Sequence, residues 1–159
     1  MLRALLATAT ATLVLAAPAA ADWSGDGAGD VLAVRSDGAL LLYRGTGAGA
    51  FQPNGPQVIG SGFAQFGALM TGDWSGDGKP DILAVPADGR LLLYRGNGAG
   101  GFVTGQGEQI GVGFAQFTAL LFVRDWSGDG KPDLIARAQD GRLLLYRGNG
   151  GGGFVNGQG

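Results

Sequence analysis

The nine residues DWSGDGKPD at 73–81 decide how this sequence is interpreted, because they recur letter for letter at 125–133. A near copy, DWSGDGAGD, occupies residues 22–30. Each copy has aspartate at positions one, five and nine, serine at position three and glycine at position six. Oxygen ligands at alternating positions can turn inward on one cation, and the glycine permits the sharp bend that this needs. The three loops are therefore predicted to bind a hard metal ion.

The predicted ligands are the side-chain oxygens at positions one, three, five and nine and the backbone carbonyl at position seven. They are Asp22, Ser24, Asp26, Ala28 and Asp30 in the first loop, Asp73, Ser75, Asp77, Lys79 and Asp81 in the second, and Asp125, Ser127, Asp129, Lys131 and Asp133 in the third. An EF-hand would need glutamate at position twelve, where all three copies have alanine. Many protein oxygens in a flexible loop favour calcium over magnesium. The alternative is a metal-free turn, in which three carboxylates would repel one another without a counter-charge.

The composition excludes several classes of function. Cysteine and histidine are both absent, so the chain has no disulfide framework, no thiol nucleophile and no histidine general base. Of the thirteen acidic residues, nine lie in the loops and three in Asp-Gly pairs, which leaves only Glu108. Hydrolysis without histidine usually needs a pair of carboxylates, so we expect no enzymatic activity. The net charge of −2 and the lack of a basic run argue against nucleic acid and anionic membranes as partners.

Short apolar runs and turns alternate behind each loop. An Asp-Gly pair precedes each copy of LLLYRG and predicts a two-residue hairpin in which both turn residues adopt positive φ. The pairs lie at residues 37–38, 88–89 and 140–141. In the second copy, Leu91 and Leu93 lie on one face and Leu92 and Tyr94 on the other, which indicates a strand covered on both sides. Glycine-rich GNGAGG and GNGGGG match a dinucleotide-binding pattern, but no helix is predicted behind them, so we interpret them as turns.

Four short strands recur about every fifty residues, which is the size of one β-propeller blade. The predicted fold is all-β, with about two and a half to three blades of four antiparallel strands, a partial propeller. The repeats are residues 22–72, 73–124 and 125–159, and the third is cut short. The tryptophans at loop position two are predicted to lock neighbouring blades together, with sugar-stacking platforms as the alternative. They are Trp23, Trp74 and Trp126.

Residues 1–21 differ in kind from the rest of the chain. An early arginine, a short apolar stretch and three alanines at 19–21 predict a secretory signal peptide that ends at Ala21. A secreted protein meets calcium at concentrations at which even a weak site is useful. The alternative is that ATLVLAA forms a strand before the first loop, because TALLFV occupies the same place before the third.

The stretches DWSGDGKPDLIA and DGRLLLYRGNGGGGF resemble the FG-GAP or VCBS repeats of integrin α-subunit propellers and of many secreted bacterial proteins. The resemblance covers nearly all of the chain after residue 21. It implies a calcium loop that joins the first two strands of each blade, with ligands matching the aspartates at positions one, five and nine. The family usually has asparagine or aspartate at position three, whereas this chain has serine, so we expect a weaker site or an intervening water.

These observations together predict a secreted, calcium-binding β-propeller module for binding or adhesion to glycans or cell-surface proteins. One alternative is a lectin, because some fungal propeller lectins resemble this repeat. Another is a non-catalytic part of a larger secreted enzyme. Open strand edges and unpaired blade faces predict head-to-tail self-association or a place within a longer chain, and no membrane span is expected.

Overall fold

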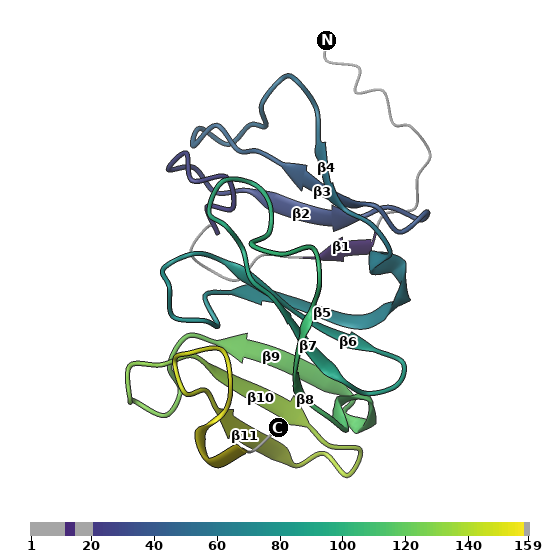
Figure 1. The fold of residues 1–159 in the computed structure, drawn as a ribbon, viewed down its shortest axis with the longest axis vertical. Coiled ribbons are helices and arrows are strands. Elements are labelled where there is room, and N and C mark those ends of the chain that lie inside the picture. The colour runs from purple at the N-terminus through teal and green to yellow at the C-terminus, as the bar shows by residue number, and fades with distance from the viewer. Residues whose placement is uncertain (1–11, 15–20, 158–159) are drawn as a thin grey trace.

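The structure is a computed structural model that describes residues 12–14 and 21–157. This part of the chain contains eleven strands in three antiparallel sheets and no α-helix, which confirms the all-β prediction. The sheets, here called blades one, two and three, follow one another down the molecule (Figure 1). No helix in the described ranges is long and apolar enough to cross a membrane.

Blades one and two have four strands each, and blade three has three. Blade one contains β1 (Thr12–Val14), β2 (Val31–Val34), β3 (Leu40–Tyr43) and β4 (Gln57–Gly60). Blade two contains β5 (Phe66–Gly72), β6 (Asp81–Pro86), β7 (Leu91–Tyr94) and β8 (Glu108–Gly111). Blade three contains β9 (Ala119–Val123), β10 (Asp133–Arg137) and β11 (Leu143–Arg147). Three short 3-10 turns complete the described structure: η1 (Phe63–Gln65), η2 (Phe114–Gln116) and η3 (Val155–Gly157).

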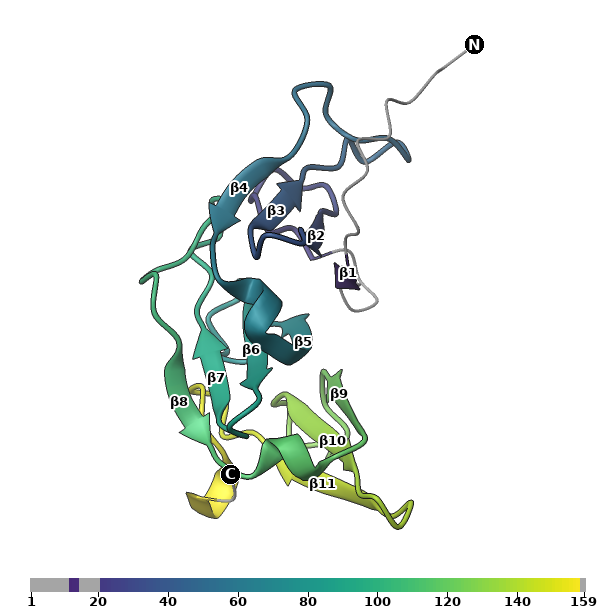
Figure 2. The same cartoon turned by 90° about the vertical axis from the view of Figure 1, so that its right-hand side faces the viewer.

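Each blade begins one strand before the sequence repeat does. The chain leaves β4, passes through η1 and enters β5, which pairs with β6 in the next blade. Each acidic loop consequently joins the first two strands of its own blade, as the family resemblance implies. Figure 2 shows the blades along an arc, with β1, β5 and β9 on the inner side and β4 and β8 on the outer side. The arc does not close, so the described residues form a partial propeller.

The strand β1 lies within the segment predicted as a signal peptide. It pairs with β2 in antiparallel register, with Thr12 opposite Val34 and Val14 opposite Leu32. This pairing favours the alternative interpretation of ATLVLAA as a strand at residues 12–14. The rest of the predicted signal peptide, residues 1–11 and 15–20, lies outside the described residues, and export stays a prediction.

The Asp-Gly pairs do lie in hairpin turns, but these turns have three residues rather than two. In blade one, the N–H of Gly38 donates to the carbonyl of Arg35 at 2.8 Å, and the N–H of Arg35 donates to the carbonyl of Ala39 at 2.9 Å. Gly38 has a φ of 86°, whereas Asp37 has no positive φ. A type I turn followed by a glycine bulge explains this pattern. Asp37 Oδ1 instead accepts the N–H of Ala39 at 3.1 Å, so the aspartate serves as a hydrogen-bond acceptor.

The hydrophobic core consists of two clusters, and each lies between neighbouring blades. The first contains Trp23, Leu32 and Leu42 from blade one with Ile82 and Leu92 from blade two, and the second contains Trp74, Leu83, Leu91 and Leu93 from blade two with Leu134 and Phe154 from blade three. Strand β7 therefore contributes to both clusters, with alternate side chains facing opposite neighbours. This confirms the prediction for the second copy of LLLYRG, whereas the third copy is open on one face, where Leu143 and Leu145 are exposed.

Candidate metal centre

Position one of each loop is an aspartate whose carboxylate accepts hydrogen bonds from the loop's own backbone. Asp73 Oδ1 accepts the N–H of Gly76 at 2.8 Å and that of Asp77 at 3.1 Å, and Oδ2 accepts the N–H of Gly78 at 2.9 Å. The first and third loops repeat these three bonds. The glycines at positions four and six have positive φ, which turns successive N–H groups toward one carboxylate.

Position nine is a buried aspartate that ties the loop to the far end of the next hairpin. Asp81 Oδ2 accepts the N–H of Ser75 at 2.7 Å, and Oδ1 accepts the N–H of Gly96, just beyond β7, at 3.0 Å. Asp30 and Asp133 repeat both bonds. Burial raises the pKa of Asp81, and the two N–H donors oppose that rise because they stabilise the ionised form.

Position five is the most variable part of the candidate site. Its Oδ1 accepts the N–H of position seven in every loop, at 2.9 Å, 2.9 Å and 3.1 Å in chain order. The other oxygen differs between loops: Asp77 Oδ2 lies 3.8 Å from Lys79 Nζ, whereas Asp129 Oδ2 lies 2.8 Å from an Arg147 guanidinium nitrogen. The Arg147 hydrogen bond lowers the pKa of Asp129. Ala28, Lys79 and Lys131 thus contribute position-seven N–H groups to the loop.

Position three is a serine whose hydroxyl is buried and makes no hydrogen bond of good geometry with the described residues. This holds for the Oγ atoms of Ser24, Ser75 and Ser127, so it is a property of the repeated loop. The Ser75 and Ser127 hydroxyls nonetheless lie near enough to Asp81 and Asp129 to contribute a lowering effect on the pKa of those carboxyls. A buried hydroxyl without a partner costs free energy, and repeating the cost three times suggests that something outside the chain satisfies it. A cation is one such group, because a hydroxyl oxygen is a suitable ligand for calcium.

The loops fit calcium in chemistry, although their carboxylates are turned toward the backbone. Among the described residues, no three acidic side chains gather closely enough to hold a metal ion. Six backbone N–H bonds in each of the first two loops, and seven in the third, also offset the repulsion among the three carboxylates, so repulsion alone does not require a cation. The candidate ligand atoms are nonetheless all oxygen, the position-one Oδ2 and the position-five Oδ1 each accept only one hydrogen bond, and the position-three hydroxyl makes no well-formed hydrogen bond. These residues are suited to calcium and to no soft metal.

Two features of the loops were absent from the sequence prediction. The bond from the position-nine carboxylate to the N–H of Gly45, Gly96 or Gly148 joins residues that lie fifteen apart in the chain. The recurrence of a glycine after every LLLYR was the available signal. The Arg147 contact with Asp129 had no such signal, because the same arginine in the other repeats does not contact its loop.

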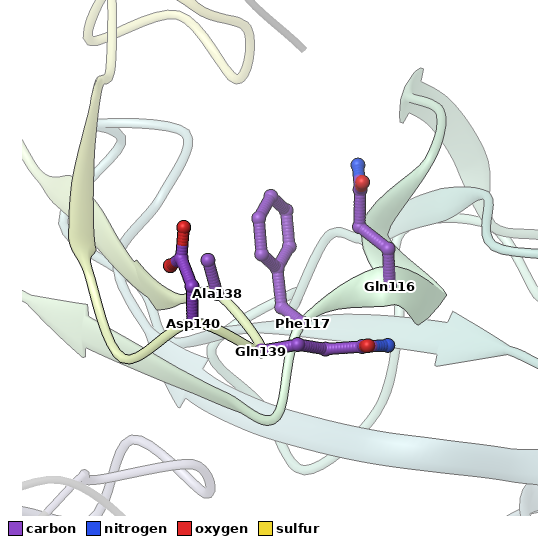
Figure 3. A pocket seen from close by; sticks show the side chains of 5 residues that line it. All are labelled: Gln116, Phe117, Ala138, Gln139 and Asp140. Carbon is purple, nitrogen blue, oxygen red and sulfur yellow. The ribbon is translucent and has the colours of Figure 1, made fainter.

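A shallow depression lies away from the loops, between η2 and the turn that joins β10 to β11 (Figure 3). Its lining consists of Gln116, Phe117, Ala138, Gln139 and Asp140. The Asp140 carboxylate already accepts a bond of 2.6 Å from Arg142. The depression thus offers a ligand two side-chain amides and one aromatic ring, and its lining includes no residue of the three acidic loops.

Three blades that carry the same loop in the same place define a partial β-propeller built from tandem repeats. The FG-GAP-like repeat family matches the chain at residues 22–84 and again at residues 73–136. Together the matches span 22–136, which is more than half of the 159 residues, and the chain belongs to this family. No curated protein matches the chain.

Proposed function

We propose that this chain is an exported, calcium-stabilised repeat module that binds a glycan or a protein at a cell surface. The observation that carries the calcium part is the buried, unpartnered hydroxyl at position three of all three loops. Calcium would be held in each loop by the carboxylates at positions one, five and nine, this hydroxyl, and the position-seven carbonyl. Its role is to fix the loop between the first two strands of the blade.

The binding part of the proposal is supported by how the acidic side chains are used. Each of the thirteen carboxylates accepts at least one hydrogen bond, and the only acid outside the loops and turns, Glu108, pairs with Arg95 at 3.3 Å. A hydrolase of this composition would need two carboxylates that face a substrate together. The repeated arrangement instead suits a scaffold that presents connecting loops to a partner. Glycan-array and protein-capture experiments would separate a lectin from a protein-binding module.

Thermal unfolding with a chelator and with millimolar calcium tests the calcium proposal. A ligand that binds only the folded state adds RT ln(1 + [L]/Kd), so calcium at about 100 Kd contributes roughly 2.7 kcal/mol per independent site. The midpoint should then rise by several degrees, and magnesium at equal concentration should raise it less. An unfolding midpoint that calcium leaves unchanged would refute the calcium proposal.

Matched variants make the test specific to the loops. Combined Asp26→Ala, Asp77→Ala and Asp129→Ala substitutions should abolish the response to calcium. Asp88→Ala removes an exposed aspartate from a hairpin turn instead, and its response should equal that of the unchanged chain. Export is tested separately, by finding Asp22 at the N-terminus of protein recovered from the medium.

A further inference from the structure

The two interfaces between blades are built from the same contacts, displaced by one repeat. The ring of Trp23, in the blade-one loop, packs edge-on against Phe102 of blade two at 5.6 Å. The ring of Trp74, in the blade-two loop, packs edge-on against Phe154 of blade three at 5.2 Å. Each phenylalanine ends the glycine-rich turn that follows the LLLYR strand of its blade. One rule therefore describes both interfaces: a loop tryptophan receives the turn phenylalanine of the next blade.

Glycines allow the loop and the turn to touch along their backbones. A Cβ at Gly25 would collide with the carbonyl oxygen of Gly98, and a Cβ at Gly76 would collide with that of Gly150. At the first interface the N–H of Gly100 also donates to the Trp23 carbonyl at 2.9 Å. The glycine-rich turns are thus docking elements for the preceding blade.

The turn also inserts beneath an arginine of the preceding blade. A Cβ at Gly100 would meet the Arg44 guanidinium and the Leu42 side chain, and one at Gly152 would meet the equivalent Arg95 and Leu93. Arg95 in addition donates to the carbonyl of Gly151 at 3.1 Å. Leucine, arginine and tryptophan of one blade therefore form a single receiving surface for the turn.

Blade three has the same receiving surface, but no turn occupies it among the described residues. Its loop is identical in sequence to the blade-two loop. Trp126 is 68% exposed, whereas Trp74 is fully buried, and Leu143 is also 68% exposed. A Cβ at Gly128, the equivalent of Gly76, would meet nothing within 4 Å. We call Trp126, Gly128, Leu143 and Leu145 the receiving face.

Blade one has the complementary element, and no part of the described structure covers it. Its turn at residues 45–51 reads GTGAGAF, and Phe51 is 56% exposed, whereas its equivalent Phe154 is buried. A Cβ at Gly49, the equivalent of Gly100 and Gly152, would meet nothing within 4 Å. We call residues 45–51 the docking turn.

We infer that the docking turn of one copy of this chain seats on the receiving face of a second copy, with Phe51 against Trp126. The second copy is the occupant because the chain already contains this interface twice, so both free surfaces have known partners of the same shape. Two copies of three blades give six, which lies within the four to eight blades of typical propellers. In a dimer that closes into a ring, both docking turns are seated on receiving faces and no such surface is left exposed.

Sedimentation and tryptophan quenching across a range of concentrations test this interface together. Trp126 is the one exposed tryptophan of three, so acrylamide quenching reports on it while Trp23 and Trp74 stay shielded. We expect quenching to fall several-fold as sedimentation reveals the dimer. A chain that stays monomeric at hundreds of micromolar, with Trp126 quenched throughout, overturns the inference and leaves a different partner or a continuing repeat as the occupant.

A mixing experiment tests that the contact runs head to tail. Leu143→Asp damages only the receiving face and Phe51→Asp only the docking turn, so each variant alone should be monomeric. Mixed in equal amounts, they retain one intact interface and should form a dimer that grows no further. Failure of the folded pair to associate when mixed would contradict the inference.

The control is Val103→Asp, which places the same charge on a side chain of similar exposure, 58%, outside both surfaces. This variant should dimerise as the unchanged chain does, and loss of its dimer would also contradict the inference. If Leu143→Asp lowers the unfolding midpoint, Trp126→Ser takes its place, with sedimentation as the readout. Adding a chelator throughout keeps the outcome independent of the calcium proposal.

Discussion

Arg147 donates a hydrogen bond of 2.8 Å to Oδ2 of Asp129, so the third loop already has a positive charge at one of its predicted calcium ligands. The equivalent Arg95 reaches the next blade instead, where it bonds the carbonyl of Gly151. Blade three has no following blade in the described residues, and its arginine turns to its own loop. Docking of a second copy and calcium binding at this loop would therefore both involve the Arg147 side chain.

The first prediction is that Arg147→Gln strengthens calcium binding at the third loop. Removing a competing cation from a partly exposed carboxylate should raise the affinity about two- to fivefold, the range expected for a surface ion pair. Calorimetric titration of calcium measures this change. Arg95→Gln is the control, because Arg95 pairs with Glu108 rather than with a loop. A weaker third site in Arg147→Gln would show that the arginine supports the loop instead of competing for it.

The second prediction concerns the buried aspartate at position nine. Asp81→Asn keeps the shape of the side chain but turns one acceptor into an amide donor that faces a backbone N–H. Hydrogen bonds to charged groups are worth about 1.5–3 kcal/mol, so we expect a loss of roughly 2 kcal/mol or more. Denaturant unfolding in chelator measures it without calcium. Asp77→Asn, at exposed position five, should cost well under half as much. Equal losses would refute the idea that the position-nine aspartate holds the loop to the hairpin, an arrangement called here the position-nine clamp.

The bonds of the position-nine clamp could largely not be predicted from the sequence, whereas the strands around them could. Leu91, Leu92 and Leu93 alternate between two cores as the apolar pattern indicates, because a strand period of two is local. The bond from Asp81 to Gly96 depends on how a loop and a distant turn meet, which no local pattern encodes. The Asp-Gly pairs correctly predicted hairpins, but the predicted two-residue turns are three-residue turns in the structure. An aspartate also suits a type I turn, where its carboxylate accepts a backbone N–H.

The repeat also explains where the prediction for the tryptophans was incomplete. Trp23 and Trp74 lie between blades as expected, but Trp126 is exposed, although all three have nearly the same neighbours in sequence. Burial here depends on the next blade, not on the residue itself. A repeat pattern predicts an interface only where both of its halves are present.

The third prediction uses this contrast. Trp74→Ala should cost about 3–5 kcal/mol, because it leaves a large cavity between blades two and three. Trp126→Ala should change the unfolding free energy of the dilute monomer by less than about 0.5 kcal/mol, as expected of an exposed site. Denaturant curves at sub-micromolar concentration make the comparison. Similar losses for the two variants would mean that Trp126 is buried in the isolated chain.

The fourth prediction is a pH dependence at the first hairpin. The Arg35 side chain holds the pKa of Asp37 at about 2, below its ordinary value of 3.8. The pKa of Asp37 is lower in the folded chain than in the unfolded chain. The stabilisation of the fold by ionised Asp37 is therefore complete above about pH 4 and is lost as the pH falls toward 2. Carboxyl NMR titration of the unchanged chain and of Arg35→Gln checks this. An unaltered pKa in Arg35→Gln would assign the shift to the backbone N–H of Ala39 instead.

The last prediction is that the first loop is the weakest calcium site and that Gly29→Pro strengthens it. The second loop has Pro80 at this position, and the carbonyls of Gly29 and Pro80 lie against the equivalent glycines Gly45 and Gly96, so the backbone path is shared. Gly29 has no positive φ, so proline fits, and it stabilises by up to about 1 kcal/mol by restricting the unfolded chain. The reverse change, Pro80→Gly, should lose a similar amount. Calorimetry that finds the first loop weakened by Gly29→Pro would contradict this ranking.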